Sequence, residues 1–260
     1  MSIENPNKLN NLLAIWPQNT VAVNEWLHKQ GISDQLKQKY LKSNWVKMIG
    51  PGAVIRVGDR LKWEGGVYAL QTQLKLPVHV GAKTALELQG YGHYVRLGAG
   101  KIELFGVKGT KLPKWYMDYK WQEEIKYQVT GFLTNDLGLR EFSIGEFVLS
   151  ISTPERAVLE YLHNTHDVLD EAYYLMQGLT TLRPNVLQPL LKACTSIKVK
   201  RLFLFLAERA NHPWLEGINL SNIDLGEGPR QIVKNGYLDS KYKITVPLSF
   251  KSGEHNESIF

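Results

Sequence analysis

The 260-residue sequence has a single cysteine and no hydrophobic run that approaches 18 residues. Cys194 alone can form neither an intramolecular disulfide nor a thiolate cluster, which excludes a disulfide scaffold, a zinc ribbon and an iron–sulfur centre. The longest apolar stretch, Leu202–Ala207, has the length of part of a core helix and is too short to span a bilayer. The first seven residues are mostly polar, with Glu4 as their only charged side chain, whereas a secretory signal needs a basic segment followed by an apolar one. We therefore expect a cytoplasmic protein that does not enter a membrane.

Acidic residues are scarce at the amino end. The first 62 residues hold nine Lys or Arg against four Asp or Glu, which accounts for +5 of the net charge of +6. Positive charge concentrated on a small first domain is typical of a protein that contacts a phosphate backbone, although an ordinary solvated surface is the alternative. With 43% hydrophobic residues the chain can still bury a core, and its length suggests two domains.

The apolar spacing of the first 43 residues predicts three short helices. The first has a stripe at i, i+3, i+4 and i+7, made by Leu9, Leu12, Leu13 and Trp16. A second is predicted over residues 21–30, with Thr20 as its N-cap and Gly31 as its left-handed stop. Ser33 follows almost at once and is expected to cap the third helix.

Two β-rich runs come next, Trp45–Ile49 and Ala53–Val57, on either side of Gly50-Pro51-Gly52. This pattern predicts a hairpin. Three helices followed by a hairpin make a winged helix-turn-helix, here over residues 8–58.

One face of the third helix carries two amides and two ammonium groups. A glutamine can bond adenine bidentately, and a lysine can reach guanine or a phosphate. The sequence therefore predicts a DNA-binding set on this helix and the hairpin, consisting of Gln35, Lys37, Gln38, Lys39, Lys42, Lys47 and Arg56. Winged helices also serve as protein-docking modules, so a protein-interaction module without DNA binding remains an alternative prediction.

The rest of the chain changes pattern twice. A helix is predicted over 64–74, a short strand over 78–80 and a helical turn over 83–88. Period-two spacing then predicts strands over 94–97, 101–107, 126–132 and 141–149. Thr153 and Pro154 open a run of four predicted helices, over 154–163, 167–177, 184–193 and 196–210. We expect an α+β protein with a DNA-binding domain over residues 1–95. A mixed α+β domain over 96–260 would hold a small antiparallel sheet and a helical cluster.

Familiar catalytic motifs are missing. Gly98–Lys101 imitates a phosphate loop but is followed by Ile102, where Ser or Thr would be needed for magnesium. The sequence contains no G-x-S-x-G elbow and no H-E-x-x-H helix. We expect a non-enzyme with no catalytic, cofactor-binding or metal-binding residues.

Weaker sequence motifs leave one enzymatic alternative, a metal-dependent nuclease. Glu124-Ile125-Lys126 imitates the E-x-K of metal-dependent nucleases, with Asp118 or Glu103 as the upstream acid. The cluster of His163, His166, Asp167 and Asp170 falls across a predicted helix junction, where these residue types commonly act as caps. Cys194 is expected to be buried packing.

A second basic stretch lies near the carboxyl end. It comprises Lys192, Lys198, Lys200, Arg201 and Arg209, opposed by Glu208. The default interpretation is a solvated surface, and the functional alternative is contact with DNA phosphates or with an acidic protein.

Five segments resemble the AbiEi family of antitoxins from type IV toxin–antitoxin systems, in the branch with an amino-terminal winged helix. They are Trp45–Ala53, Tyr68–Gln73, Pro77–His93, Ser152–Glu160 and Tyr242–Pro247, and they extend the resemblance over most of residues 8–248.

The resemblance implies a cytoplasmic transcriptional autorepressor of an abortive-infection system. Such a protein binds inverted repeats in the promoter of its own operon and opposes a cognate nucleotidyltransferase toxin without needing a stable complex with it. Two repeats require two protein copies, as a dimer or as monomers that cooperate on DNA. The catalytic signature of the toxin is absent here, so the chain resembles the antitoxin.

Overall fold

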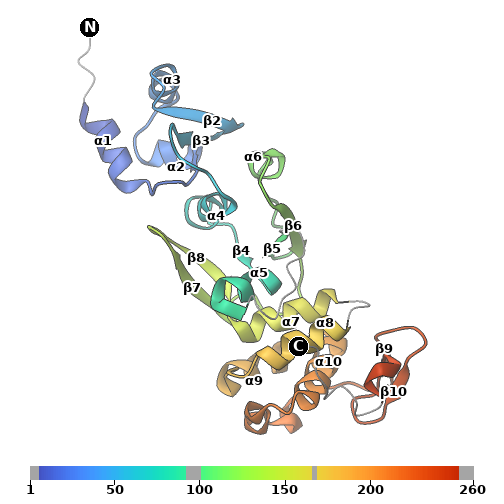
Figure 1. Cartoon of the computed structure of the whole chain (residues 1–260). Coiled ribbons are helices and arrows are strands. Elements are labelled where there is room, and N and C mark those ends of the chain that lie inside the picture. Colours follow the sequence, from blue (N-terminus) through green and yellow to red (C-terminus); the bar gives the residue numbers. More distant parts are fainter. Residues whose placement is uncertain (1–5, 92–100, 166–168, 252–260) are drawn as a thin grey trace. The chain divides into compact units, whose positions relative to one another are not determined.

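The computed structural model describes residues 6–91, 101–165 and 169–251, with side chains described from residue 8. At the amino end it contains three helices and a small sheet of order β1-β3-β2 (Figure 1). The elements are α1 (Pro6–Ile15), β1 (Ala22–Val23), α2 (Asn24–Lys29), α3 (Asp34–Lys42), β2 (Val46–Gly50) and β3 (Ala53–Arg56). This is the predicted winged helix-turn-helix, with β2 and β3 as the wing.

Local signals place most of these boundaries. The Ser33 hydroxyl accepts a hydrogen bond of 3.2 Å from the backbone N–H of Leu36, as expected of an N-cap. Gly31 ends α2 with a φ of +76°, and Gly52 makes the wing turn with a φ of +78°. Both backbone conformations favour glycine.

The predicted start of the second helix was wrong. Ala22 and Val23 form β1, which pairs with Val54 and Ala53 of the wing, so α2 begins at Asn24. Thr20 is not a cap, because its hydroxyl donates a 2.7 Å hydrogen bond to the Pro17 carbonyl. Ala22 and Val23 are extended because they pair with β3, and this tertiary contact overrides the local helical pattern.

Contacts divide the chain into two compact units that interleave along the sequence. The first comprises the described parts of 1–80, 99–129 and 141–151, and the second those of 81–98, 130–140 and 152–260. The predicted domain boundary near residue 95 falls among residues 92–100, outside the described ranges, and stays a prediction.

A five-stranded sheet follows the winged helix, with the order β6-β5-β4-β8-β7. Its strands are β4 (Val78–Val80), β5 (Lys101–Gly106), β6 (Glu124–Val129), β7 (Leu139–Ile144) and β8 (Phe147–Ser152). The single strand predicted over 141–149 is interrupted, because Gly145 turns the chain between β7 and β8 with a φ of +57°. The strand predicted over 94–97 lies outside the described residues.

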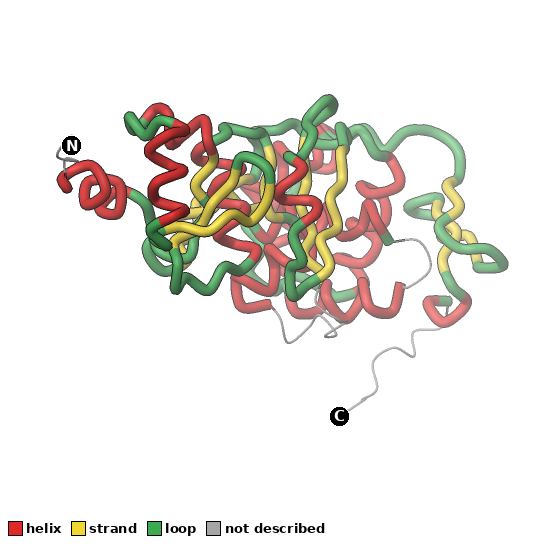
Figure 2. The backbone as a smooth tube through the Cα atoms, turned by 90° about the horizontal axis from the view of Figure 1, so that it is seen from above, coloured by secondary structure: helices red, strands yellow, loops and turns green. Residues whose placement is uncertain are grey.

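The predicted α+β class is confirmed, and Figure 2 shows helix and strand mixed along the chain. The larger sheet is mixed in direction, whereas the sequence indicated antiparallel pairing. β4 and β5 are antiparallel, but β5 pairs with β6 and β4 pairs with β8 in parallel. The connection from β5 to β6 contains α6 (Lys114–Asp118), a crossover long enough to bring the chain back in the same direction.

Short helices lie on either side of β4 in the chain. α4 (Trp63–Tyr68) continues into a π-helical segment, Ala69–Gln73, and α5 (Ala82–Leu86) follows β4. Within this segment, the Gln73 side chain accepts from the Val23 N–H at 2.9 Å and donates to the Val21 carbonyl at 2.7 Å. One buried amide therefore satisfies two backbone groups of the winged helix.

The helical cluster of the second unit agrees with the predicted run of four helices. It consists of α7 (Pro154–Asn164), α8 (Leu169–Gly178), α9 (Pro184–Ala193) and α10 (Ile197–Arg209). A small sheet closes the unit, made by β9 (Arg230–Gln231), β10 (Tyr237–Asp239) and β11 (Ile244–Val246). No helix in the described ranges combines the length and apolar character that crossing a bilayer requires.

Candidate nucleic-acid interface

Helix α3 has a packed side and an exposed side. Leu36, Tyr40 and Leu41 pack against the core of the winged helix, which includes Leu12, Trp16, Leu27, Ile32 and Val46. Gln35, Gln38, Lys39 and Lys42 are exposed, on the side that the sequence indicated, and Asp34 is also exposed in the first turn. The helix therefore presents amide and ammonium groups to solvent while apolar burial on its other side holds it in place.

Lys37 does not join this exposed set. Its residue is only 8% exposed, and its Nζ donates hydrogen bonds of 2.9 Å to Oδ1 of Asn24 and of 2.9 Å to Oδ1 of Asp34. Lys37 precedes Tyr40 by three residues and Leu41 by four, so it shares their side of the helix. Its ammonium ties α3 to α2, and its hydrogen bond lowers the pKa of the Asp34 carboxyl.

Of the two predicted wing residues, one is exposed and the other is half-buried. Lys47 is exposed on β2, opposite Ile55 of β3. Arg56 is half-buried, and its Nη2 donates a 2.7 Å hydrogen bond to the Leu13 carbonyl of α1. Its guanidinium carbon lies 5.3 Å from the centroid of the Trp16 ring. Arg56 thus fastens the wing to α1, and Lys47 is the wing cation left at the surface.

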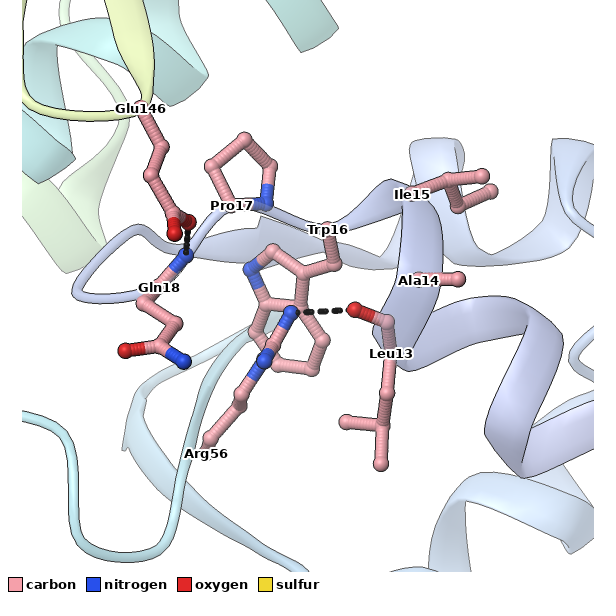
Figure 3. Close-up of a pocket in the computed structure, with 8 residues that line it drawn as sticks. All are labelled: Leu13, Ala14, Ile15, Trp16, Pro17, Gln18, Arg56 and Glu146. Carbon is pink, nitrogen blue, oxygen red and sulfur yellow. Dashed lines mark hydrogen bonds between the residues drawn. The ribbon is translucent and has the colours of Figure 1, made fainter.

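A cavity of about 410 Å³ lies beside Arg56 (Figure 3). It is lined by Leu13, Ala14, Ile15, Trp16, Pro17, Gln18, Arg56 and Glu146. Glu146 accepts a 3.3 Å hydrogen bond from the Gln18 backbone N–H. The two charged groups of the lining have opposite signs, so the cavity is not selective for an anion.

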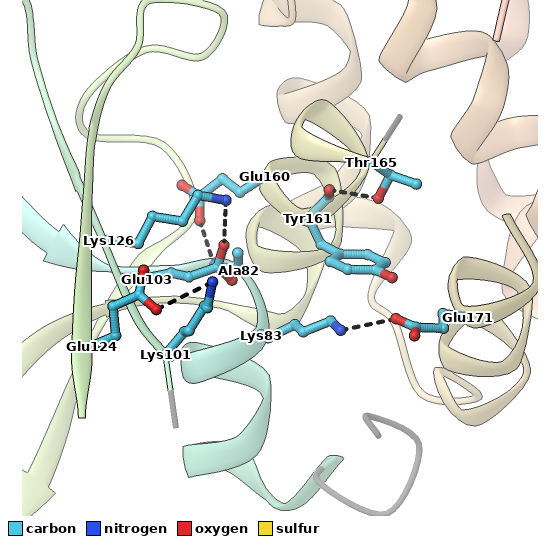
Figure 4. Close-up of polar contacts among 10 residues, drawn as sticks. All are labelled: Ala82, Lys83, Lys101, Glu103, Glu124, Lys126, Glu160, Tyr161, Thr165 and Glu171. Carbon is cyan, nitrogen blue, oxygen red and sulfur yellow. Dashed lines mark hydrogen bonds and ion pairs between the residues drawn. The ribbon is translucent and has the colours of Figure 1, made fainter. Parts of the chain in front are cut away.

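Glu103, Glu124 and Lys126 of the nuclease alternative form cross-strand ion pairs, and Asp118 is exposed at the end of α6. In the parallel register of β5 and β6, Lys101 lies opposite Glu124 and Glu103 opposite Lys126. The pairs close at 3.2 Å and 3.4 Å between nitrogen and oxygen (Figure 4). Within the described ranges, no group of three or more His, Cys, Asp or Glu side chains is placed to hold a metal ion. The E-x-K pattern is accounted for by strand pairing.

Of the other isolated candidates, His163 and Cys194 are packing residues, and Asp170 is exposed in the first turn of α8. His163 stacks on Phe132, with ring centroids 4.1 Å apart, while His166 and Asp167 lie outside the described residues. Cys194 is buried, as predicted, and burial raises the pKa of its thiol.

The basic stretch of residues 192–209 is not a continuous surface. Arg201 is 2% exposed and donates hydrogen bonds to the carbonyls of Leu225, Gly226, Gly228 and Lys243. Lys200 is buried, and Lys198 donates a 2.9 Å hydrogen bond to the Thr165 carbonyl. Lys192 is the exposed member of the stretch, and Lys198 and Arg209 are half-buried.

The sequence analysis missed a basic segment that lies next to the wing. Residues 107–121, which include α6, carry four exposed lysines, and Trp115 of α6 lies against Gly50 of β2. The lysines alone are a visible signal in the sequence, but their proximity to the wing is not, because 64 positions separate Gly50 from Lys114.

Comparison with known families gives two matches that together span nearly the whole chain. A model described as "Transcriptional regulator, AbiEi antitoxin, Type IV TA system" matches residues 99–247. A second, described as "Transcriptional regulator, AbiEi antitoxin N-terminal domain", matches residues 5–97. No curated protein sequence matches the chain.

Among solved structures, the chain is similar to the RV2827C protein from Mycobacterium tuberculosis. The TM-score is 0.53 at 12% sequence identity, and the match covers 91% of this chain and 88% of that one. At this identity the likeness supports the fold alone.

Proposed function

The chain belongs to the AbiEi family of antitoxins and transcriptional regulators of type IV toxin–antitoxin systems, and from this premise we propose that it represses its own operon. In this proposal the winged helix binds inverted repeats in the promoter. The protein also counteracts a cognate nucleotidyltransferase toxin in the cytoplasm.

The observation that carries the DNA-binding proposal is the division of α3 into two sides. Gln35, Gln38, Lys39 and Lys42 are exposed, whereas Leu36, Tyr40 and Leu41 pack inward. In a winged helix this third helix enters the major groove, where amides can read adenine and lysines can reach guanine or phosphates. Lys47 would contact the backbone from the wing. Lys37 and Arg56 would support the interface by holding α3 and the wing in place.

Two copies of the protein would occupy two inverted repeats, either as a dimer or as monomers that cooperate on DNA. The symmetry of the operator would then match that of the bound pair, as in other helix-turn-helix repressors. The antitoxin activity is assigned to the residues that follow the winged helix. A growth-rescue experiment tests this assignment: the chain is co-expressed with a candidate nucleotidyltransferase toxin from its own operon, and growth should be restored.

Fluorescence anisotropy tests the repressor proposal directly. The full chain is titrated against the duplex immediately upstream of its own gene and against a scrambled duplex, each over a range of KCl concentrations. We expect preference for the native duplex and a steep fall of affinity with salt, because bound lysines release counterions from DNA. Equal weak binding to both duplexes would remove autoregulation from the proposed function.

A further inference from the structure

The connection between β5 and β6 carries an unusually basic surface. Residues 107–121 contain four lysines and one acid, all exposed, which are Lys108, Lys111, Lys114, Lys120 and Asp118. Across the residues that the structure describes, none of these lysines forms an ion pair with an acid. We call residues 107–121 the α6 lysine segment. The segment has a net charge of +3, and with Glu123, which follows it before β6, the whole connection keeps +2. This excess of positive charge suits a polyanion.

Aromatic packing holds this segment in a defined position. Trp115 and Tyr116 of α6 are 3% and 0% exposed. Trp121 donates a 2.8 Å hydrogen bond from Nε1 to the Tyr116 carbonyl, and the rings of Tyr116 and Trp121 lie 5.0 Å apart between centroids. Because the lysines lie on a backbone fixed by buried rings, less conformational entropy is lost when they bind.

The segment adjoins the wing directly. A Cβ atom placed on Gly50, the last residue of β2, would lie 2.8 Å from Cβ and 2.9 Å from Cα of Trp115. Backbone therefore meets backbone there, with no side chain of residue 50 between them. Figure 1 shows β2 running from the end of α3 towards α6. Lys47 lies on that strand, and Lys114 is the neighbour of Trp115 in sequence.

We propose that the α6 lysine segment is a second DNA-contacting element, which binds backbone phosphates next to those contacted by the wing. This inference rests on the proposed function, since it extends the winged-helix interface along the same duplex. Lysines act on phosphates as point charges and read no base sequence. The segment would therefore increase affinity for all duplexes and leave the preference for the operator to α3.

The test compares two variants with the same loss of charge. Lys111→Gln/Lys114→Gln removes two lysines of the segment, and Lys75→Gln/Lys101→Gln removes two exposed lysines elsewhere in the first unit. Anisotropy titrations over KCl use the full chain with the upstream and scrambled duplexes. Far-ultraviolet circular dichroism and thermal melting confirm that both variants fold.

We expect the segment variant to weaken binding to both duplexes by the same factor. Its log–log salt slope should fall in magnitude by about 2, one for each lost phosphate contact. The control variant should retain the wild-type slope. Asp118→Asn removes the only acid of the segment and should strengthen binding to both duplexes.

The outcomes separate the two proposals. If wild-type protein does not prefer its upstream duplex, the proposed repressor function fails. If wild-type protein binds with that preference, but Lys111→Gln/Lys114→Gln keeps its affinity and salt slope, the second contact is refuted and the repressor function stands.

Discussion

In α7, Nε of Arg156 donates a hydrogen bond of 2.7 Å to Oε1 of Glu160, one helical turn further along. Both residues are buried. The Ser152 hydroxyl and the Ala82 backbone N–H donate to the other carboxylate oxygen at 2.8 and 3.1 Å. A buried charge is thus matched by a partner and by hydrogen bonds from two further segments of the second unit.

Arg156→Met should strongly destabilise the protein. The change leaves the Glu160 carboxylate buried without its cation, and breaking such a pair costs about 3 to 5 kcal/mol. Urea unfolding followed by circular dichroism measures the loss. The double variant Arg156→Met/Glu160→Gln removes both charges and should recover part of it. A double variant no more stable than Arg156→Met would contradict this account of Glu160.

The pair of Glu155 and Arg183 should make stability depend on pH. Burial alone would raise the pKa of Glu155, but hydrogen bonds from the Arg183 side chain and backbone outweigh it, so the pKa is lowered. A carboxyl with a lowered folded pKa stabilises above its unfolded value of 4.5, and this stabilisation is lost as the pH falls through the folded pKa.

Arg183→Gln should therefore lose stability at pH 7 and lose progressively less as the pH falls below 4.5. The Arg183 side chain is 55% exposed, so the difference at neutral pH should be only about 1 kcal/mol. Thermal melts from pH 7 to pH 3 measure it. Lys192→Gln, which removes the same charge at an exposed position of α9, is the control. A deficit that stays constant down to pH 3 would show that Glu155 is not responsible.

Gln38→Ala and Lys42→Ala should separate base reading from phosphate contact. Loss of a glutamine that reads a base should cost about 1 to 3 kcal/mol on the operator and relax specificity, whereas loss of a phosphate lysine should weaken all duplexes alike. Anisotropy with native and single-substituted operators measures both effects. If both variants bind as wild type does, the recognition side of α3 is misplaced.

Lys37→Ala should chiefly reduce the stability of the winged helix. Its ammonium is bonded to both Asn24 and Asp34 and is largely buried. Because the Asp34 side chain is 66% exposed, solvent screens the pair, and its loss should cost about 1 kcal/mol. Lys42→Ala, on the exposed side of the same helix, should leave the melting temperature unchanged. Equal melting temperatures for the two variants would argue against the bridging role of Lys37.

Gly50→Ala should disturb the contact between the wing and α6. The added methyl group would meet Trp115 at 2.8 Å, too close for either backbone to remain in place. Overpacking of this kind costs about 1 to 3 kcal/mol. Thermal melting measures it, and Gly131→Ala, where a Cβ meets nothing within 4 Å, is the matched control. Equal stability of the two variants would mean that the wing can shift without cost.

The candidate site was predictable where a residue's role depends on its own helix or strand. The spacing of Gln35, Gln38, Lys39 and Lys42 places them together on α3, and tertiary structure leaves them exposed. In the sequence, Lys37 and Arg56 are basic residues like the exposed lysines. In the structure, Lys37 is hydrogen-bonded to Asn24 and Arg56 to the Leu13 carbonyl. Charge alone does not distinguish a lysine at the surface from one that bridges two helices.

The sequence by itself determined the winged-helix order, the Ser33 cap, the Gly31 stop and the α+β class, because these depend on local periodicity and on backbone conformation. Only the tertiary structure decided that Ala22 and Val23 form a strand, that Glu124 and Lys126 pair with β5, and that α6 lies against the wing. Those features join residues far apart in the chain, and their free energy comes from contacts that exist only after folding.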